Sequence, residues 1–206
     1  MHTTEKNPFK PIRWGVLGTG RIAGDFAQAL RDVPDAALVA VASRNAATAQ
    51  AFGRKFHVEQ CYGSYQELAD ADDVDAIYIA TPHPMHAANA IMALEGGKAV
   101  LCEKPFTINR REAEQVVNLA REKGLFLMEA MWSRFIPAID EVERLIASGE
   151  IGKVHQLSAD LGFRATDDPA HRLHDMALGG GALLDLGIYP LSMAAAQCGS
   201  VPLPRC

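Results

Sequence analysis

Short apolar runs alternate with longer segments of helical pattern along the first 130 residues of the chain. The runs have the length of strands buried on both faces, and the segments between them space their apolar residues as helices do. This alternation predicts parallel βαβ units, and hence an α/β fold with a doubly wound parallel sheet. The expected strands are Ile12–Leu17, Leu38–Ala42, Ala76–Ala80, Ala99–Cys102 and Leu125–Met128. The expected helices are Ile22–Arg31, Ala46–Lys55, His86–Glu95 and a segment capped by Asn109 that ends at Lys123.

The alternation stops near residue 130. A further helix is predicted around Val142–Ile146, and Val154–Leu161 is expected to form a longer strand. We therefore expect two domains, 1–130 and 131–206, of which the second begins an α+β arrangement.

Composition and charge narrow the class of protein. The chain has 206 residues, 49% hydrophobic and 22% charged, which is ordinary for a globular protein, and its net charge of −5 favours neither nucleic acid nor an anionic membrane as partner. No apolar stretch is expected to reach the ~20 residues of a membrane span, and Met1–Arg13 lacks the apolar centre of a secretory signal. The cysteines lie far apart without a C-x-x-C pair, so reduced thiols and a cytoplasmic location are expected. They are Cys61, Cys102, Cys198 and Cys206.

A glycine-rich turn follows the first predicted strand. In Gly18-Thr19-Gly20-Arg21-Ile22-Ala23, the first glycine permits a tight turn, the second permits close approach of a pyrophosphate, and Ala23 permits close packing of the helix on the sheet. The N-terminus of the next helix offers backbone amides to an anion. The pattern predicts a dinucleotide site in a Rossmann domain; the alternative is a purely structural turn.

The second predicted strand ends at Ser43-Arg44, where enzymes that prefer NAD usually carry an acidic residue. A hydroxyl and a guanidinium suit a 2′-phosphate instead, because arginine binds phosphate bidentately. NADP is therefore favoured over NAD, unless Arg44 is only a solvated loop residue.

The segment that follows the third predicted strand carries Thr81-Pro82, whose backbone is expected to line the nicotinamide side. His83 and His86 have the spacing of a metal pair, but no cysteine or carboxylate cluster accompanies them, so no metal site is expected. His86 is instead a candidate for a helix-start or ligand-contact role, and His83 for a structural one.

Two further motifs carry candidate catalytic groups. Glu103-Lys104-Pro105 directly follows an apolar run, which places Lys104 at the carboxyl edge of the sheet, where open α/β sheets bind ligands. In Gly179–Tyr189, a helix after the three glycines, kinked at Pro190, would put Asp185 and Tyr189 on one face. Hydride transfer to a carbonyl needs a proton donor, and the reverse needs a base. Lys104 and Tyr189 are the candidates, with Asp185 as an orienting group; the alternative is a local Glu103–Lys104 ion pair and a core tyrosine.

These motifs resemble the glucose–fructose oxidoreductase/inositol dehydrogenase/MocA family. Ala99–Pro105 carries the family's Glu-Lys-Pro signature, while Leu127–Phe135 and Gly179–Tyr189 are similar to its dimeric dihydrodiol dehydrogenase branch. The resemblance implies a Rossmann domain, then a mostly antiparallel open sheet, with NADP held between them.

The same resemblance implies roles for individual residues. Lys104 and Tyr189 would be catalytic, Asp185 would belong to the catalytic site, and Trp132 and Arg134 would lie near the cofactor. The full set of expected cofactor-binding residues is Gly18, Thr19, Gly20, Arg21, Ile22, Ser43, Arg44, Thr81, Pro82, His86, Glu103, Lys104, Trp132 and Arg134. Expected substrates are cyclic polyols, sugars or dihydrodiols, and family members associate as homo-oligomers.

The C-terminal part differs from the family pattern. The chain ends soon after the glycine-rich segment, and Ser200–Cys206 does not resemble the family's continuation. We expect the second domain to be truncated, which leaves homo-oligomer formation doubtful for this chain. Beside an NADP-dependent oxidoreductase, the sequence therefore allows a non-catalytic dinucleotide-binding module or an inactive truncated family member.

Overall fold

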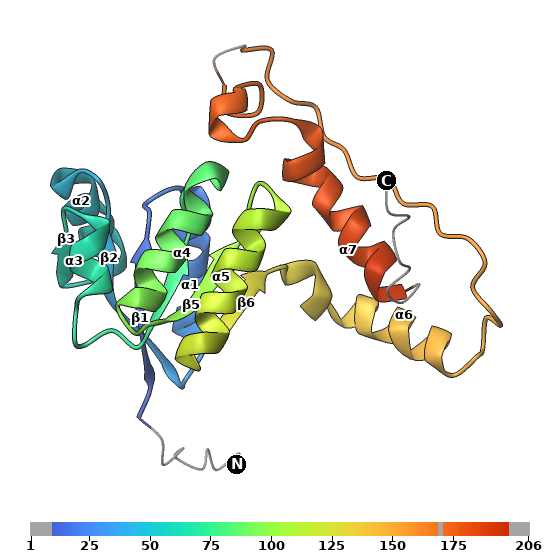
Figure 1. Cartoon of the computed structure of the whole chain (residues 1–206), viewed down its shortest axis with the longest axis horizontal. Coiled ribbons are helices and arrows are strands. Elements are labelled where there is room, and N and C mark those ends of the chain that lie inside the picture. Colours follow the sequence, from blue (N-terminus) through green and yellow to red (C-terminus); the bar gives the residue numbers. More distant parts are fainter. Residues whose placement is uncertain (1–9, 169–170, 198–206) are drawn as a thin grey trace. The chain divides into compact units, whose positions relative to one another are not determined.

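The computed structural model describes residues 10–168 and 171–197. The chain divides into two compact units, Met1–Glu129 and Ala130–Cys206 (Figure 1).

The first unit is built on one six-stranded sheet with strand order β3-β2-β1-β4-β5-β6. β1 pairs in parallel with β2 and β4, β2 with β3, and β4 with β5. The predicted doubly wound sheet is therefore confirmed, and the short strand β3 is an addition to it. The strands are β1 (Ile12–Leu17), β2 (Ala36–Ala42), β3 (Gln60–Tyr62), β4 (Ala76–Ile79), β5 (Ala99–Glu103) and β6 (Leu127–Ala130).

Helices connect these strands and begin where the sequence supplies caps. The Asn45 side chain accepts the Ala47 N–H at 2.9 Å, and Asn109 accepts the Glu112 N–H at 3.0 Å. Gly124 ends its helix with a left-handed φ of 64°, as such C-terminal glycines do. The helices are α1 (Arg21–Ala29), α2 (Ala46–Phe56), α3 (Tyr65–Ala69), α4 (His86–Glu95) and α5 (Arg110–Lys123), with 3-10 turns at Leu30–Asp32 and His83–Met85.

The core of this unit lies between the sheet and its helices. Leu17, Ile77, Ile79 and Val100 from the central strands are at most 1% exposed, and Leu94 of α4 is fully buried. Cys102 is also fully buried, and this burial raises the pKa of its thiol. Because this core holds the strands in place, the loops that follow their carboxyl ends begin at fixed positions.

An ion pair joins the start of β1 to the start of β4. Asp75 accepts hydrogen bonds from Arg13 Nη2 at 2.6 Å, Nε at 3.0 Å and the backbone N–H at 2.8 Å. The hydrogen bonds from the Arg13 side chain lower the pKa of Asp75 below its ordinary 3.8. The two side chains are about 40% exposed, at 42% and 43%, so solvent screens the pair.

Asp75→Asn is expected to lower the free energy of unfolding slightly at neutral pH. A carboxyl with a lowered pKa stabilises the fold above its unfolded-state pKa, and this stabilisation is lost as the pH falls through the folded-state pKa. Urea unfolding at a series of pH values should show the difference from the parent shrinking below pH 3.8. Asp35→Asn is the exposed control, and a difference independent of pH would contradict the role of the charge.

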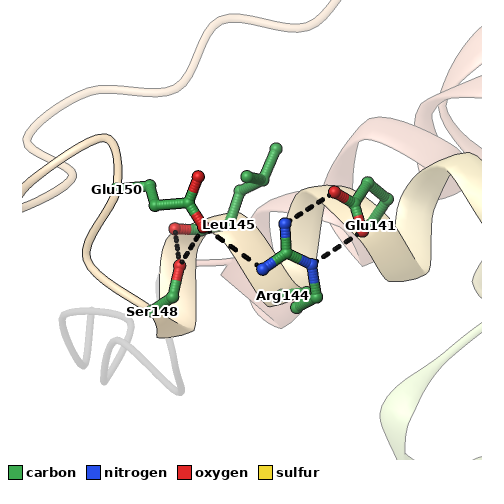
Figure 2. A network of polar contacts seen from close by, with 5 residues as sticks. All are labelled: Glu141, Arg144, Leu145, Ser148 and Glu150. Atoms are coloured by element: carbon green, nitrogen blue, oxygen red, sulfur yellow. Dashed lines mark hydrogen bonds and ion pairs between the residues drawn. The ribbon is translucent and has the colours of Figure 1, made fainter.

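The second unit is mainly helical in its described part. It contains the 3-10 turns Trp132–Phe135 and Met176–Leu178, helix α6 (Pro137–Ala147), a π-helical turn (Leu183–Gly187) and helix α7 (Ile188–Gln197). Arg144 of α6 donates to Glu141 at 2.8 Å and to Glu150 at 3.2 Å, and Ser148 Oγ also donates to Glu150 (Figure 2). This exposed network closes the C-terminal turn of α6.

The predicted strand Val154–Leu161 is wrong. The segment is irregular, and all strands in the described ranges lie at or before Ala130. An apolar alternation becomes a strand only when a neighbouring strand completes its hydrogen-bond ladder, and no such neighbour is present among the described residues of this unit. The C-terminal segment Ser200–Cys206 lies outside the described residues, as does Cys198.

The helical stretch Met176–Gln197 is long and apolar enough to cross a membrane by length and composition, with a mean hydropathy of 1.2. The expectation that no stretch reaches this length is therefore wrong. The evidence for a membrane span is weak, however, because this stretch contains a run of glycines and the buried Asp185, which pairs with Arg172.

Candidate functional site

The turn after β1 has the geometry that the fingerprint predicts. Gly18 has a φ of +108°, and a Cβ there would lie 2.7 Å from the carbonyl oxygen of Ala80 at the end of β4. Its N–H donates to the Ala42 carbonyl at 2.9 Å, which ties the turn to the end of β2. Thr19, half-buried, completes the turn before Gly20. The tight turn therefore requires glycine at position 18.

The N-terminus of α1 is open to a ligand. A Cβ on Gly20, the N-cap residue, would meet nothing within 4 Å, and neither a capping side chain nor an acidic residue occupies the first turn. Arg21 and Ile22 are exposed there, whereas Ala23 is fully buried against the sheet. Backbone N–H groups and the positive end of the helix dipole fit a pyrophosphate at this position.

Ser43 and Arg44 follow β2 at the same edge of the sheet. Ser43 is half-buried and its Oγ accepts the Asn45 N–H at 3.4 Å, while Arg44 is exposed. An exposed guanidinium beside this edge fits a phosphate group chemically, and the dinucleotide fits the residues present.

His86 joins two of the loops at this edge. It is fully buried, with Nε2 2.8 Å from the Thr81 carbonyl oxygen and Nδ1 2.8 Å from the Pro105 carbonyl oxygen. The Thr81 hydroxyl accepts a hydrogen bond from Asn89 at 2.9 Å, and Pro82 is exposed. His86 thus lies at the start of α4 (His86–Glu95), as expected, and both of its ring nitrogens lie within hydrogen-bond distance of backbone carbonyl oxygens. Over residues 10–168 and 171–197, no group of ligating side chains is arranged to hold a metal ion.

Glu103 ends β5, and Lys104 follows it, half-buried. The Glu103 carboxylate accepts a hydrogen bond from the buried Tyr78 hydroxyl, and its Oε2 accepts the Lys104 backbone N–H at 3.2 Å. Burial raises the pKa of Glu103, although these hydrogen bonds and the charges of Lys104 and His86 oppose the rise. The Lys104–Pro105 peptide bond is cis. Because Glu103 is buried and accepts the hydroxyl of the buried Tyr78, its carboxylate faces the interior of unit 1.

The second unit holds the remaining predicted residues. Tyr189 Oη accepts a hydrogen bond from Trp132 Nε1 at 2.9 Å, with the two rings 5.9 Å apart and nearly perpendicular. Arg134 donates from Nε to Ser192 Oγ at 2.9 Å. These contacts bring the Trp132–Phe135 turn to the first turns of α7.

Asp185 is 5% exposed and accepts a hydrogen bond from Arg172 Nη1 at 3.3 Å. It stands in the π-helical turn before α7 rather than in a regular helix that kinks at Pro190. The proline ring would clash with the carbonyl four residues earlier in an α-helix, and a wider turn relieves this clash.

The loop before this helix closes around Gly180. A Cβ on Gly180 would lie 2.7 to 2.9 Å from the carbonyl oxygens of Arg172, Leu173 and Asp175. The N–H of Gly180 donates to the Asp175 carbonyl at 2.9 Å, and that of Gly181 to the Leu173 carbonyl at 2.9 Å. The backbone of the glycine run therefore packs closely against the backbone of residues 172–175.

The predicted residues fall into two sets. The first set lies in unit 1 and consists of Gly18, Arg44, Thr81, His86 and Lys104 with their neighbours. The second set lies in unit 2 and consists of Trp132, Arg134, Asp185 and Tyr189.

Unit 2 also contains a cavity of about 190 Å³ between α6 and α7. Its lining includes Tyr189 and Arg134.

Two contact residues were not predicted. Tyr78 sits in an apolar run that indicates only a core strand, and nothing in the sequence pairs it with Glu103. Nothing in the sequence near Arg172 pairs it with Asp185, and the signal that could have found it is the need of a buried carboxylate for a cation.

Comparison with known proteins places both parts of the chain. Residues 12–131 match a family described as "Oxidoreductase family, NAD-binding Rossmann fold", and residues 139–203 match the "GFO/IDH/MocA C-terminal domain". Among curated proteins, the bovine trans-1,2-dihydrobenzene-1,2-diol dehydrogenase is 44% identical over 182 residues, 87% of this chain and 54% of that protein. The human enzyme of that name is 42% identical over 86% of this chain and 53% of its own length. The chain thus spans about half the length of these relatives.

Solved structures agree with this assignment. KijD10, a 3-ketoreductase from Actinomadura kijaniata in complex with NADP and TDP-benzene, superposes with a TM-score of 0.85 at 37% identity, over 92% of this chain and 58% of that one. Apo scyllo-inositol dehydrogenase from Lactobacillus casei gives a TM-score of 0.66 at 25% identity, over 69% and 43%.

Proposed function

This chain belongs to the GFO/IDH/MocA family of oxidoreductases, and we propose on that premise that it is an NADP-dependent oxidoreductase. It transfers a hydride between the nicotinamide and a carbon that bears a hydroxyl or carbonyl group. The proposed substrates are cyclic polyols, sugars or dihydrodiols. Relatives named as dihydrodiol dehydrogenases and a neighbour in complex with NADP and TDP-benzene support this class.

One observation carries the proposal. Within unit 1, three groups follow the carboxyl ends of strands in one parallel sheet. The open N-terminus of α1 follows β1, the exposed Arg44 follows β2, and the half-buried Lys104 follows β5. Open α/β sheets bind their ligands at this edge. The same edge therefore offers an amide cradle for pyrophosphate, a cation for the 2′-phosphate and an ammonium for the reacting end.

The proposed chemistry assigns each residue a task. When bound, the nicotinamide supplies or accepts the hydride. One of two candidates, Lys104 or Tyr189, gives the single proton that the substrate oxygen needs during reduction and takes it back during oxidation. Trp132 fixes the Tyr189 oxygen through its N–H, and Asp185, held beside Arg172, orients a substrate hydroxyl.

Titration of the purified chain with NADPH and NADH, followed by intrinsic fluorescence, tests the nucleotide half of the proposal. A screen of dihydrodiols, cyclic polyols and aldoses for change in nicotinamide absorbance tests the catalytic half. Saturable NADPH binding with turnover is expected. Binding without turnover would favour the non-catalytic dinucleotide-binding module, because unit 1 holds the glycine-rich turn and Arg44 while Asp185 and Tyr189 belong to unit 2. No binding by a folded sample would refute the cofactor assignment.

Arg44→Asp is expected to weaken NADPH binding by about tenfold or more, which corresponds to 1.4 kcal/mol or more, and to spare NADH binding. The reason is that a carboxylate repels the 2′-phosphate but accepts a hydrogen bond from a ribose hydroxyl. Paired titrations of parent and variant measure the change. Arg31→Asp is the matched control, because Arg31 is exposed beyond the C-terminal end of α1. Equal weakening of both nucleotides would reject Arg44 as the 2′-phosphate ligand.

A further inference from the structure

Aromatic rings connect α1 to the centre of the sheet in unit 1. Phe26 of α1 stacks on Tyr78 of β4, with ring centroids 3.8 Å apart and an interplanar angle of 17°. Trp14 of β1 packs its ring against Phe26 at 5.4 Å and 70°. Tyr78 is only 2% exposed. Helix α1, which begins at the glycine-rich turn, therefore holds the Tyr78 ring in place through Phe26.

The Tyr78 hydroxyl extends this line to β5. It donates to Glu103 Oε1, and burial together with the Glu103 charge raises the pKa of the hydroxyl, which keeps it a donor. The other carboxylate oxygen, Oε2, accepts the Lys104 backbone N–H at 3.2 Å. The buried carboxylate thus has Tyr78 on one oxygen and the backbone of Lys104 on the other.

We propose, resting on the proposed function of Lys104, that Tyr78 is a positioning residue. Its hydroxyl fixes the Glu103 carboxylate, and the carboxylate fixes the backbone of Lys104 at the point where the chain leaves the sheet. If Tyr78 served only to fill the core, its replacement by phenylalanine would change the position of Glu103 and the turnover little. A positioning tyrosine acts through the hydroxyl.

The pKa of Glu103 is a measurable property that distinguishes a positioning tyrosine from one that only fills the core. Burial raises the pKa of Glu103; the Tyr78 hydroxyl, the Lys104 N–H and the charges of Lys104 and His86 lower it, and the buried Cys102 thiol lies beside it. Loss of a hydrogen bond to the ionised form raises a carboxyl pKa. Tyr78→Phe should therefore raise the pKa of Glu103 further, and the Lys104 amide, bonded to the same carboxylate, should report the change.

The experiment compares Tyr78→Phe with Tyr62→Phe in the full chain. Tyr62 is the matched control, since it is half-buried in β3 of the same sheet and its hydroxyl donates to Gln60 at 3.0 Å. The pH titration of the Lys104 backbone amide is followed by NMR, and kcat and KM are measured with NADPH. We expect a higher titration midpoint and a fall in kcat of about tenfold in Tyr78→Phe, with little change in KM for NADPH. Tyr62→Phe should match the parent in each measurement.

An unchanged amide titration in a folded Tyr78→Phe variant would overturn the proposal. Should the parent show no turnover, the proposed function fails, but the amide titration still decides whether Tyr78 controls Glu103. Phe26→Leu serves as a second variant if Tyr78→Phe does not fold. It removes the stacked ring and leaves the hydroxyl, so it should move the midpoint in the same direction by less; no movement would also count against the proposal.

Discussion

Lys104→Ala is expected to lower turnover by about a hundredfold or more, because it removes a group that moves a proton at the substrate oxygen. Tyr189→Phe should have an effect of the same order, since it removes a hydroxyl and leaves the ring. NADPH affinity should change little in either variant, because the amide cradle at the start of α1 remains. Steady-state kinetics and nucleotide titration of the same samples measure both quantities.

Lys123→Ala is the control for the loss of a lysine, since Lys123 is an exposed residue in the last turn of α5. It should retain the activity of the parent. Full turnover in either Lys104→Ala or Tyr189→Phe would remove that residue from the mechanism. A parallel loss of nucleotide affinity and turnover would instead indicate that Lys104 serves binding alone.

Gly20→Ala is expected to fold like the parent and to lose NADPH affinity by about tenfold or more, a change of at least 1.4 kcal/mol. A Cβ at this position meets nothing within 4 Å of the protein, so the added methyl group occupies only the space that a pyrophosphate would need. Gly18→Ala differs, because its Cβ would lie 2.7 Å from the Ala80 carbonyl at a φ of +108°. That variant should lose about 1–3 kcal/mol of folding stability as well.

Gly97→Ala separates the two effects. Gly97 has a φ of +76° and open space around its missing Cβ, and it lies after α4, away from the glycine-rich turn. Thermal unfolding should show strain, while nucleotide titration should match that of the parent. Unchanged NADPH affinity in Gly20→Ala would show that the cofactor does not approach this backbone.

Local pattern was sufficient to predict most of unit 1. The segment His86–Glu95 was predicted with the bounds that α4 has, because apolar periodicity and the glycines after it mark both ends. β3 was missed since Gln60–Tyr62 is short and mixed in polarity. In unit 2, the strand predicted at Val154–Leu161 was wrong, because apolar alternation shows a preference and not the presence of a partner strand.

The candidate site was predictable in its residue types and less so in their contacts. Gly18 and Gly20 could be identified because glycine is the residue that permits the backbone conformations and close approaches of such a turn. The contact of Glu103 with Tyr78, or of Asp185 with Arg172, joins segments distant in sequence, and only packing determines which polar groups meet. The assignment of Lys104 and Tyr189 to catalysis stays a prediction until it is tested.

Gly180 has a consequence for how such a chain can change over evolutionary time. Three backbone carbonyl oxygens surround the place where its side chain would begin. Carbonyl positions are set by the course of the chain, so no substitution of a neighbouring side chain can enlarge this space. A lineage that retains the turn at Asp175 therefore has a single residue available at position 180. The side chains of Met176 and Leu183, by contrast, are exposed to solvent.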